Sequence, residues 1–357
     1  MVRGVVSTGK LRATLDPEPA EAFIIAVPTP FSEGKRPDLA YIEAAAKAIA
    51  PVLERGNLVI LESTAAVGAT EKLAAWLKEE RPDLTFPQDG GPNPDIHIAH
   101  CPERVLPGYV LHELVSNDRI VGGMTPACAE RATALYQVFL GGECFEPDAR
   151  TAELAKLTEN SFRDVNIAFA NELSVICDGL DIDVWKLIRL ANRRPRVSIL
   201  QPGPGVGGHC IAVDPWFIVD SAPESAQLIR AVRNINDAKP HWVLDKINRS
   251  ADRFKAPVIG LLGLAFKADI DDLRESPALQ IAEAVVATHN TTLVVEPNVD
   301  ELPDVLAGKA ELTDLSRCLA EADLIVILVD HKEFGSLDTQ RLASKVVIDT
   351  RGVLLRE

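Results

Sequence analysis

The stretch from residue 22 to residue 63, AFIIAVPTPFSEGKRPDLAYIEAAAKAIAPVLERGNLVILES, places an alanine-rich segment between two short apolar runs. The runs FIIAV (23–27) and LVILES (58–63) have the length and branched side chains of buried strands, and residues 38–55 have helical character. A second helical segment at 70–80 leads to a third run, IHIAH (96–100). Strands that alternate with helices predict βαβ units and a parallel sheet.

The rest of the chain predicts two further parts. From residue 148 to 192 the pattern is helical, with a turn at 178–181, and it is followed by a loop rich in glycine and proline and by another helical stretch to about residue 254. The C-terminal part returns to alternating strands and helices. We therefore expect an α/β domain at 1–147, a helical middle region at 148–254 and a second α/β domain at 255–357. The four strand-like runs of the last part are PVIGLLGLAF (257–266), TTLVVEP (291–297), DLIVILVD (323–330) and KVVIDTRG (345–352).

Composition excludes several classes of protein. The 357 residues include 37 Lys and Arg against 52 Asp and Glu, so the net charge of −15 opposes nonspecific binding to nucleic acid or to an anionic membrane. The apolar run LIVILV (324–329) is far shorter than the ~18 residues of a membrane span, and the first residues contain no signal-peptide core. The six cysteines form no CxxC pair. These features predict a reduced, cytoplasmic, soluble α/β protein.

A dinucleotide fingerprint is absent from the expected place. No GxGxxG motif follows an N-terminal strand. The segment GPGVGG (203–208) follows a loop and opens no evident helix, and GLLGLAF (260–266) follows a strand with the wrong glycine spacing. Composition and pattern alone therefore predict no cofactor.

Cys210 is the first candidate for catalysis. It lies in GVGGHCIAVDP (205–215), beside His209 and near Asp214, in a glycine-rich setting that allows close approach of the backbone. A free cysteine is more often a small buried apolar residue. The basic segment NRRPR (192–196) instead favours a reactive thiol, because thiolates need an electropositive environment.

The segment AKLTENSFRDVN (155–166) supplies a second group of polar candidates. On a helix, Lys156, Asn160 and Arg163 share one face. A solvated polar face is the simpler interpretation, but apolar residues crowd the same helix and predict that it is largely buried. A lysine and an asparagine one turn apart can both donate hydrogen bonds to an oxyanion. The apolar residues are Phe162, Val165, Ile167 and Phe169.

Together these segments resemble the UDP-glucose/GDP-mannose dehydrogenase family, over nearly the whole chain from about residue 11 and in the family's order. The sequence RVSILQPGPGVGGHCIAVDPWFIV (196–219) is closest to the branch that oxidises UDP-N-acetyl-D-mannosamine. The fold implied is a Rossmann-type domain, a helical middle domain and a Rossmann-like UDP-binding domain. The motifs are FIIAVPTPF, LVILEST, AHCPERVLPG, KLTENSFRDVNIAFANELS, GPGVGGHCIAVDPWF, GLAFKADIDDLRESPA and VVIDTRG.

The resemblance implies an NAD-dependent, four-electron oxidation of the sugar's primary alcohol to a carboxylate. Cys210 would capture the intermediate aldehyde as a thiohemiacetal, which a second oxidation converts to a thioester. Lys156 and Asn160 would stabilise the oxyanions, and either Glu103 or Asp214 would handle the hydrolytic water. The family positions for the UDP-sugar match Arg104, Arg163, Arg194, Arg196, Gly207 and Lys267, and those for NAD match Thr29, Thr64, Thr70, Arg274 and Arg351. For Thr70, a plain helix N-cap is the alternative.

The match begins part-way through the family's first domain. The family's opening strand, its GxGxxG turn and the next strand are not represented, a difference of about 50–60 residues. We therefore expect FIIAV to form an open, apolar sheet edge, and a truncated product or a misplaced start codon to explain the difference. The alternatives are another UDP-hexose or UDP-N-acetylhexosamine 6-dehydrogenase, or an inactive UDP-sugar-binding remnant. The long helix is a candidate homodimer interface.

Overall fold

The computed structural model describes residues 2–355 except Glu33, Pro92, 106–108, His209 and Asp338. His209, the predicted neighbour of the candidate nucleophile, thus lies outside the described residues. The chain forms two compact units, residues 1–158 and 159–357. None of the six cysteines forms a disulfide, and none of the helices in the described ranges is long and apolar enough to cross a membrane.

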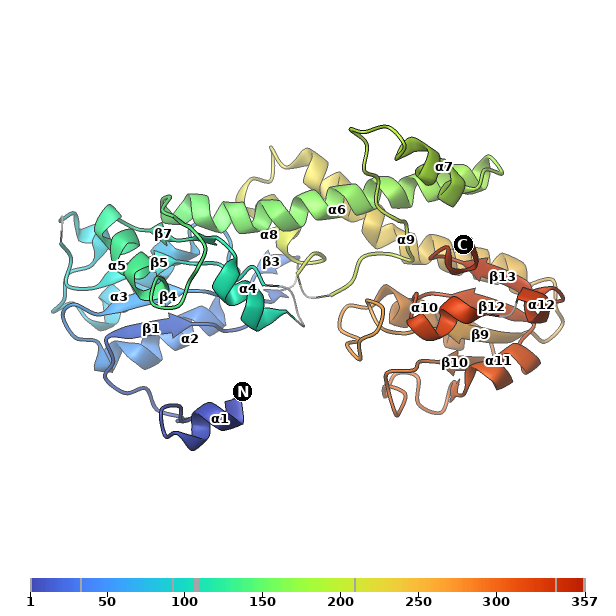
Figure 1. Ribbon diagram of the computed structural model, residues 1–357, viewed down its shortest axis with the longest axis horizontal. Coiled ribbons are helices and arrows are strands. Elements are labelled where there is room, and N and C mark those ends of the chain that lie inside the picture. Colours follow the sequence, from blue (N-terminus) through green and yellow to red (C-terminus); the bar gives the residue numbers. More distant parts are fainter. Residues whose placement is uncertain are drawn as a thin grey trace. The chain divides into compact units, whose positions relative to one another are not determined.

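The first unit is built on a four-stranded sheet of order β1-β4-β5-β7 (Figure 1). The predicted strands are confirmed as β1 (Ala22–Ile25), β4 (Leu58–Leu61) and β5 (His97–His100), which run parallel, and β7 (Gly122–Gly123) pairs antiparallel with β5. The predicted helices are α2 (Ala40–Ile49), which continues into a 3₁₀ turn, and α3 (Ala69–Glu80). The smaller elements are α1 (Val2–Ser7), β2 (Phe31–Ser32), β3 (Arg36–Pro37), α4 (Val110–Ser116), β6 (Arg119–Ile120), α5 (Pro126–Tyr136) and β8 (Cys144–Phe145).

Helices cover both faces of this sheet. Because successive side chains of a strand point to opposite faces, β4 contributes Val59 to one core and Ile60 to the other. The first core is shared with α2 and α3, and the second with α5. Strand β1 is an edge of the sheet, and Ile24 is 48% exposed there, so within the described residues the expected open, apolar edge is confirmed.

A 31-residue helix, α6 (Ala149–Gly179), confirms the predicted long helix. The turn after it contains Asp181 at φ +54°, and α7 (Val184–Ala191) begins at an Asp183 N-cap. The glycine- and proline-rich loop then leads to α8 (Asp214–Ser221) and α9 (Gln227–Ala251).

The expectation that the apolar residues of α6 are buried is wrong for its aromatic side chains. Phe162 is 71% exposed and Phe169 is 52% exposed. The buried face of α6 carries polar residues as well as apolar ones such as Leu157 and Ala168, and two of the polar residues meet polar residues of α9. Asp164 accepts a 2.7 Å hydrogen bond from Arg233, and Asn171 donates one of 2.9 Å to Asn236.

The last part of the second unit is a five-stranded parallel sheet of order β11-β10-β9-β12-β13 (Figure 1). Residues of α9 and α10 pack on one face, and residues of α11 pack on the other. The chain passes from β9 to β10 on one side and returns to β12 on the other, and ligands bind at such reversals in open α/β sheets. The elements are β9 (Val258–Leu262), α10 (Pro277–Thr288), β10 (Thr291–Val295), β11 (Glu311–Leu312), α11 (Leu315–Glu321), β12 (Leu324–Ile327), α12 (Thr339–Leu342) and β13 (Val346–Asp349).

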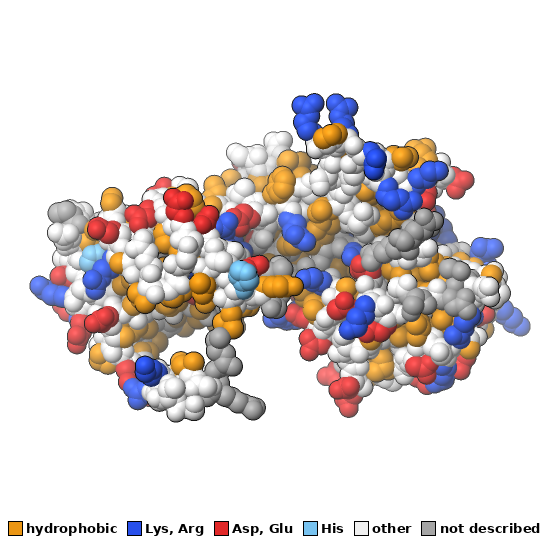
Figure 2. All heavy atoms as spheres, in the orientation of Figure 1, with side chains coloured by type: hydrophobic (Ala, Val, Ile, Leu, Met, Phe, Trp, Pro, Cys, Tyr) orange, Lys and Arg blue, Asp and Glu red, His pale blue; other side chains and the backbone are white. Residues whose placement is uncertain are grey.

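The predicted α/β fold class is confirmed, with a Rossmann-type sheet at each end of the chain and helices between them in sequence. Figure 2 shows acidic and basic side chains interspersed over the face that it draws.

Candidate active site

Cys210 lies in a turn that leads directly into helix α8. Its carbonyl oxygen accepts hydrogen bonds from the backbone N–H groups of Val213 (3.1 Å) and Asp214 (2.8 Å), and the residue is half-buried. Helix α8 begins only at Asp214, so the glycine-rich run before Cys210 opens no helix itself, as its sequence predicts. The thiol is therefore presented on an irregular turn at the start of a helix.

Asn160 and Asp214 are in direct contact. The side-chain amide of Asn160, on α6, donates a hydrogen bond to Oδ2 of Asp214, and Asp214 is buried. The sequence identifies both residues as candidates but does not predict that they touch. The contact fixes the Asn160 amide beside the turn that contains Cys210.

The loop after β9 also approaches Cys210. Arg274 donates hydrogen bonds to the carboxylate of Asp272, and this contact is the main cause that raises the pKa of Arg274, with a smaller contribution from Cys210. The backbone N–H of Gly208 donates to the carbonyl of Arg274. The thiol therefore has a guanidinium in its electrostatic surroundings, as a reactive cysteine requires.

Gly207 lies where no side chain fits. A Cβ at this position would be 2.4 Å from the carbonyl oxygen of Glu275 and 2.7 Å from Pro277. The cysteine loop therefore packs with its backbone against the start of α10.

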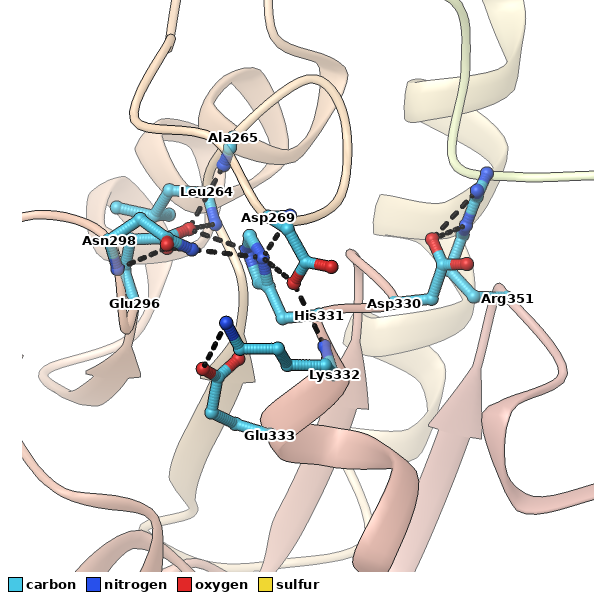
Figure 3. Close-up of polar contacts among 10 residues, drawn as sticks. All are labelled: Leu264, Ala265, Asp269, Glu296, Asn298, Asp330, His331, Lys332, Glu333 and Arg351. Carbon is cyan, nitrogen blue, oxygen red and sulfur yellow. Dashed lines mark hydrogen bonds and ion pairs between the residues drawn. The ribbon is translucent and has the colours of Figure 1, made fainter. Parts of the chain in front are cut away.

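A cleft lies at the carboxyl edge of the C-terminal sheet, at the reversal between β9 and β12. Two basic residues predicted for different ligands, Lys267 and Arg351, both line it. Arg351 is held at Asp330 by a hydrogen bond from its Nε (2.9 Å) and by an ion pair of its Nη2 (2.8 Å), as Figure 3 shows. The other residues that line the cleft are Pro204, Gly205, Ala265, Phe266, Pro277, Ala278, Leu328, Val329 and Asp330.

The other predicted arginines of the second unit do not line this cleft. Arg163 is exposed on α6, and Arg194 and Arg196 are exposed in the segment after α7. Figure 2 shows basic side chains gathered over α7 and the loop that follows it.

In the first unit, predicted residues lie at the carboxyl edge of the parallel strands. Thr29 follows β1 and Thr64 follows β4, and both are half-buried. The hydroxyl of Ser63 ties the two strand ends together, because it accepts from the N–H of Val27 and donates to its carbonyl, both at 2.8 Å.

Thr70 is not an N-cap, so that alternative is wrong. Helix α3 starts at Ala69, and its N-cap is Gly68 at φ +93°. The backbone N–H and the hydroxyl of Thr70 donate to Glu153 (2.8 and 2.6 Å), as does the N–H of Gly68 (2.6 Å). Burial raises the pKa of Glu153, against the opposing effect of these hydrogen bonds. The sequence gives no signal for this role of Glu153, because 83 residues separate it from Thr70.

Glu103 follows β5 and belongs to a polar cluster. Its Oε1 accepts the backbone N–H groups of Arg104 and Val105, and its Oε2 lies 3.9 Å from the guanidinium of the buried Arg119. Arg119 also lies 3.5 Å from Glu62, whose pKa is raised by burial and by Glu103. Sequence reasoning missed Arg119 and Glu62.

Lys156 is half-buried on α6, one helical turn before Asn160. Because this segment is helical, Lys156 and Asn160 lie one turn apart on the same side of α6, which is the spacing behind the prediction that both donate to an oxyanion.

Three family models match consecutive parts of the chain. They are the NAD binding domain (residues 1–140), the central domain (150–238) and the UDP binding domain (260–356) of the UDP-glucose/GDP-mannose dehydrogenase family. The chain belongs to this family. Members of the UDP-glucose/GDP-mannose dehydrogenase family are NAD-dependent oxidoreductases, so the chain is classed as an enzyme with NAD as its cofactor.

Individual relatives agree with the family match. The chain is 65% identical over 354 residues to an NDP-N-acetyl-D-galactosaminuronic acid dehydrogenase from Ralstonia nicotianae, covering 99% of this chain and 84% of the relative. It is 58% identical over 362 residues to the UDP-N-acetyl-D-mannosamine dehydrogenase of Salmonella typhi, covering 99% and 86%.

Solved structures give the same result. The UDP-D-ManNAc dehydrogenase of Pyrococcus horikoshii matches with a TM-score of 0.87 at 38% identity, covering 99% of this chain and 83% of that one. The UDP-N-acetyl-mannosamine dehydrogenase of Staphylococcus aureus matches with a TM-score of 0.86 at 42% identity and the same coverage.

The family's cofactor fits one part of the first unit. The half-buried hydroxyls of Thr29 and Thr64 lie at the carboxyl ends of adjacent parallel strands, where ligands of such sheets bind. These are donors that a nicotinamide amide or a ribose can use. The sequence contains no GxGxxG turn after a strand, so the fit extends to these strand ends only.

Proposed function

We propose that this dehydrogenase oxidises the C6 primary alcohol of UDP-N-acetyl-D-mannosamine to the uronate. The observation that carries the proposal is the juxtaposition of the half-buried Cys210 with the Asn160–Asp214 contact and with Arg274. A thiol beside an amide donor and a guanidinium is the equipment that covalent capture of an aldehyde needs.

Cys210 keeps the half-oxidised sugar in the site. Two successively bound NAD⁺ molecules would supply the hydride acceptors for the two oxidations, so that RCH2OH, two NAD⁺ and one water would give RCOO⁻, two NADH and three protons. The thiolate of Cys210 forms a C–S bond to the aldehyde carbon, and the carbonyl electrons move to the oxygen. The second oxidation leaves a thioester. Water then adds to its carbon, the C–S bond breaks, and the sulfur leaves as the thiolate that starts the next turnover.

Two donors on α6 are proposed to stabilise the oxyanions. An amide NH2 group has two N–H donors, and Asn160 directs one of them at Asp214, so the other is available for a substrate oxygen. Lys156, one turn earlier, supplies a positive charge and can exchange a proton.

Either Asp214 or Glu103 is proposed to activate the hydrolytic water. Asp214 is the carboxylate in contact with Asn160, whereas Oε1 of Glu103 already accepts two backbone N–H groups. Comparing Asp214→Asn with Glu103→Gln separates them. The variant that loses the water-activating carboxylate accumulates the thioester, which trapping with hydroxylamine detects.

The remaining residues are proposed to bind the two nucleotides. Arginine suits a diphosphate because its planar guanidinium donates two hydrogen bonds at once, and Lys267 adds a point charge. We also propose the division into an NAD domain (1–147), a helical middle domain (148–254) and a UDP domain (255–357). The substrate set is Arg104, Arg163, Arg194, Arg196, Gly207 and Lys267, and the NAD set is Thr29, Thr64, Thr70, Arg274 and Arg351.

A second sugar is supported by a specific observation. The Ralstonia relative at 65% identity is named for an N-acetyl-D-galactosamine derivative, and the Salmonella relative at 58% for the mannosamine derivative. Comparing kcat/KM for the UDP-linked forms of the two sugars decides between them, since both have the same reacting carbon.

We further propose that the protein acts in the reducing cytoplasm as a homodimer formed through α6. Its six free cysteines favour a reducing compartment. The exposed Phe162, Phe169 and Ile176 lie seven residues apart on one side of α6, the spacing of a helix-pairing seam.

The test is the amount of NADH formed per UDP-N-acetyl-D-mannosamine consumed, with NAD⁺ in excess. Two NADH per sugar, abolished by Cys210→Ser, is the expected result. A folded protein that binds UDP but forms no NADH would overturn the proposal and favour the UDP-sugar-binding remnant.

A further inference from the structure

A fully buried carboxylate lies behind the cleft at the carboxyl edge of the C-terminal sheet. Glu296 directly follows β10, and its Oε2 accepts the backbone N–H groups of Leu264 (2.7 Å) and Ala265 (3.1 Å). The same oxygen lies 3.1 Å from Nε2 of His331, which is also buried (Figure 3). Burial by itself would raise the pKa of Glu296, but hydrogen bonds from His331, Leu264 and Asn298 outweigh it and lower the pKa to about 2. Glu296 is therefore an anion whenever the protein is folded near neutral pH.

The hydrogen bonds around His331 define which nitrogen of its ring carries the proton. The backbone N–H of Asp269 donates to Nδ1 at 2.9 Å, and the amide of Asn298 lies 3.1 Å from the same nitrogen. Nδ1 is thus an acceptor, and the proton is assigned to Nε2, which donates to Glu296. Ligand atoms of Asp269, His331 and Glu333 lie within 4.8 Å of one another, but the Nδ1 lone pair is already used and Nε2 faces Glu296. We therefore assign this cluster no metal.

The Glu296–His331 pair holds the loop after β9 at two points. Glu296 binds the loop at Leu264 and Ala265, and His331 binds it at Asp269. Asp269 has φ +60°, a left-handed conformation that is uncommon for a residue other than glycine and persists only where the surroundings impose it. Its side chain accepts the N–H of Lys332 at 3.0 Å, which adds a third tie at the same residue.

Lys267 lies between these two anchors. It is exposed and lines the cleft together with Phe266 and Arg351. No described hydrogen bond or ion pair of Lys267 itself fixes the loop, and its neighbour Phe266 donates its backbone N–H to the carbonyl of Asp272 (3.2 Å) within the same loop. The anchors at Ala265 and Asp269 are what tie the segment around Lys267 to Glu296 and His331.

We propose that the Glu296–His331 pair is a positioning element that holds Lys267 at the nucleotide cleft. The inference rests on the proposed function, in which the UDP diphosphate binds there. Because the backbone is fixed on both sides of Lys267, the loop does not have to become ordered when its ammonium meets a phosphate. The entropic cost of ordering the loop therefore does not reduce the affinity for UDP. Glu296 and His331 touch no substrate themselves and act through Lys267.

A double-mutant cycle on UDP binding to the full chain tests this, measured by titration calorimetry. We expect Lys267→Ala and Glu296→Gln each to weaken UDP binding by about tenfold. Because Glu296 acts through Lys267, adding Glu296→Gln to Lys267→Ala should weaken binding by less than about twofold more. A merely structural role would make the two losses multiply.

Asp323 offers a matched control, because its carboxylate accepts the N–H of Val258 at the opposite end of β9. Asp323→Asn should leave UDP affinity unchanged. If Glu296→Gln does not fold, Asn298→Ala takes its place, since it removes one donor to His331 and one to Glu296. Its expected effect is smaller, about threefold, and should likewise vanish in the Lys267→Ala background.

The outcomes separate the two proposals. Wild-type protein that binds no UDP overturns the proposed function, and the positioning role with it. Two results overturn the positioning role alone, provided that Lys267→Ala weakens UDP binding. In the first, Glu296→Gln leaves UDP affinity unchanged. In the second, Glu296→Gln weakens UDP binding by the same factor with and without Lys267→Ala.

Discussion

The side-chain amide of Asn160 donates a hydrogen bond to the buried carboxylate of Asp214, four residues after Cys210. The contact joins the middle of α6 to the first residue of α8, and so fixes the proposed oxyanion donor relative to the turn that contains the candidate nucleophile. It also gives Asp214 a role that does not depend on its being the hydrolytic base.

Asn160→Ala is expected to lower kcat for UDP-sugar oxidation by about 10²–10³-fold with little change in KM, because the lost N–H acts on the developing oxyanion. Steady-state NADH formation measures both constants. Asn166→Ala is the matched control, since among the described residues the Asn166 amide donates to the backbone of its own helix, at Phe162. An Asn160→Ala enzyme with wild-type kcat would remove this residue from the catalytic set.

Glu153 is expected to stabilise the first unit through the start of α3. Glu153→Gln replaces one acceptor oxygen by a donor that faces the N–H group of either Gly68 or Thr70, so the free energy of unfolding should fall by about 1–3 kcal/mol. Denaturant unfolding measures the loss, and hydrogen exchange of Thr70 should show the earliest opening. Thr70→Ser keeps the hydroxyl and should cost much less. Equal losses in the two variants would contradict this role.

The sequence predicted the strands and helices well because their signals are local. The runs at 58–63 and 324–329 are continuous apolar segments bounded by turns, and both became buried strands. The motif residues Cys210, Asn160 and Asp214 were also identified. Their contact was not, because it depends on how α6 and α8 pack.

Other failures have the same physical origin. Glu153, Arg119 and Glu296 each bind at least one partner more than 25 residues away in the chain, and a local sequence pattern cannot show such a partner. The sequence predicts Phe162 to be buried, because an apolar pattern shows which residues tend to leave water. The same pattern does not show whether those residues pack against their own chain.

Lys239 should make stability depend on pH. It is 4% exposed, its Nζ donates to Ser174 Oγ at 2.6 Å, and it lies 3.8 Å from the centre of the Trp242 ring. Burial, with a smaller contribution from Lys246, lowers its pKa from 10.5 to about 7. Between these values the unfolded chain binds more protons than the folded one, so the folded state gains stability as pH rises, by up to about 1.4 kcal/mol per pH unit.

Lys239→Met removes this dependence. The free energy of unfolding of the wild type minus that of Lys239→Met should increase by about 2 kcal/mol between pH 7 and pH 9, measured by denaturant unfolding at each pH. The exposed Lys332→Met is the control and should show a constant difference. A constant difference for Lys239→Met as well would mean that the folded protein keeps this lysine protonated up to its ordinary pKa.

The exposed side of α6 predicts how the chain associates. Phe162, Phe169 and Ile176 are 71%, 52% and 49% exposed, and a seven-residue spacing turns an α-helix through nearly two full turns, so the three lie close to one line. Two copies of such a line can bury each other.

Sedimentation equilibrium should give twice the 38.6 kDa chain mass. Phe162→Asp combined with Phe169→Asp should raise the dimer dissociation constant at least about 100-fold, because it places charges in an apolar seam. Val138→Asp, at an 82% exposed position that is not part of α6, should leave the dimer intact. A double variant that still sediments as a dimer would place the interface elsewhere, and a wild-type monomer would leave these aromatic residues facing water.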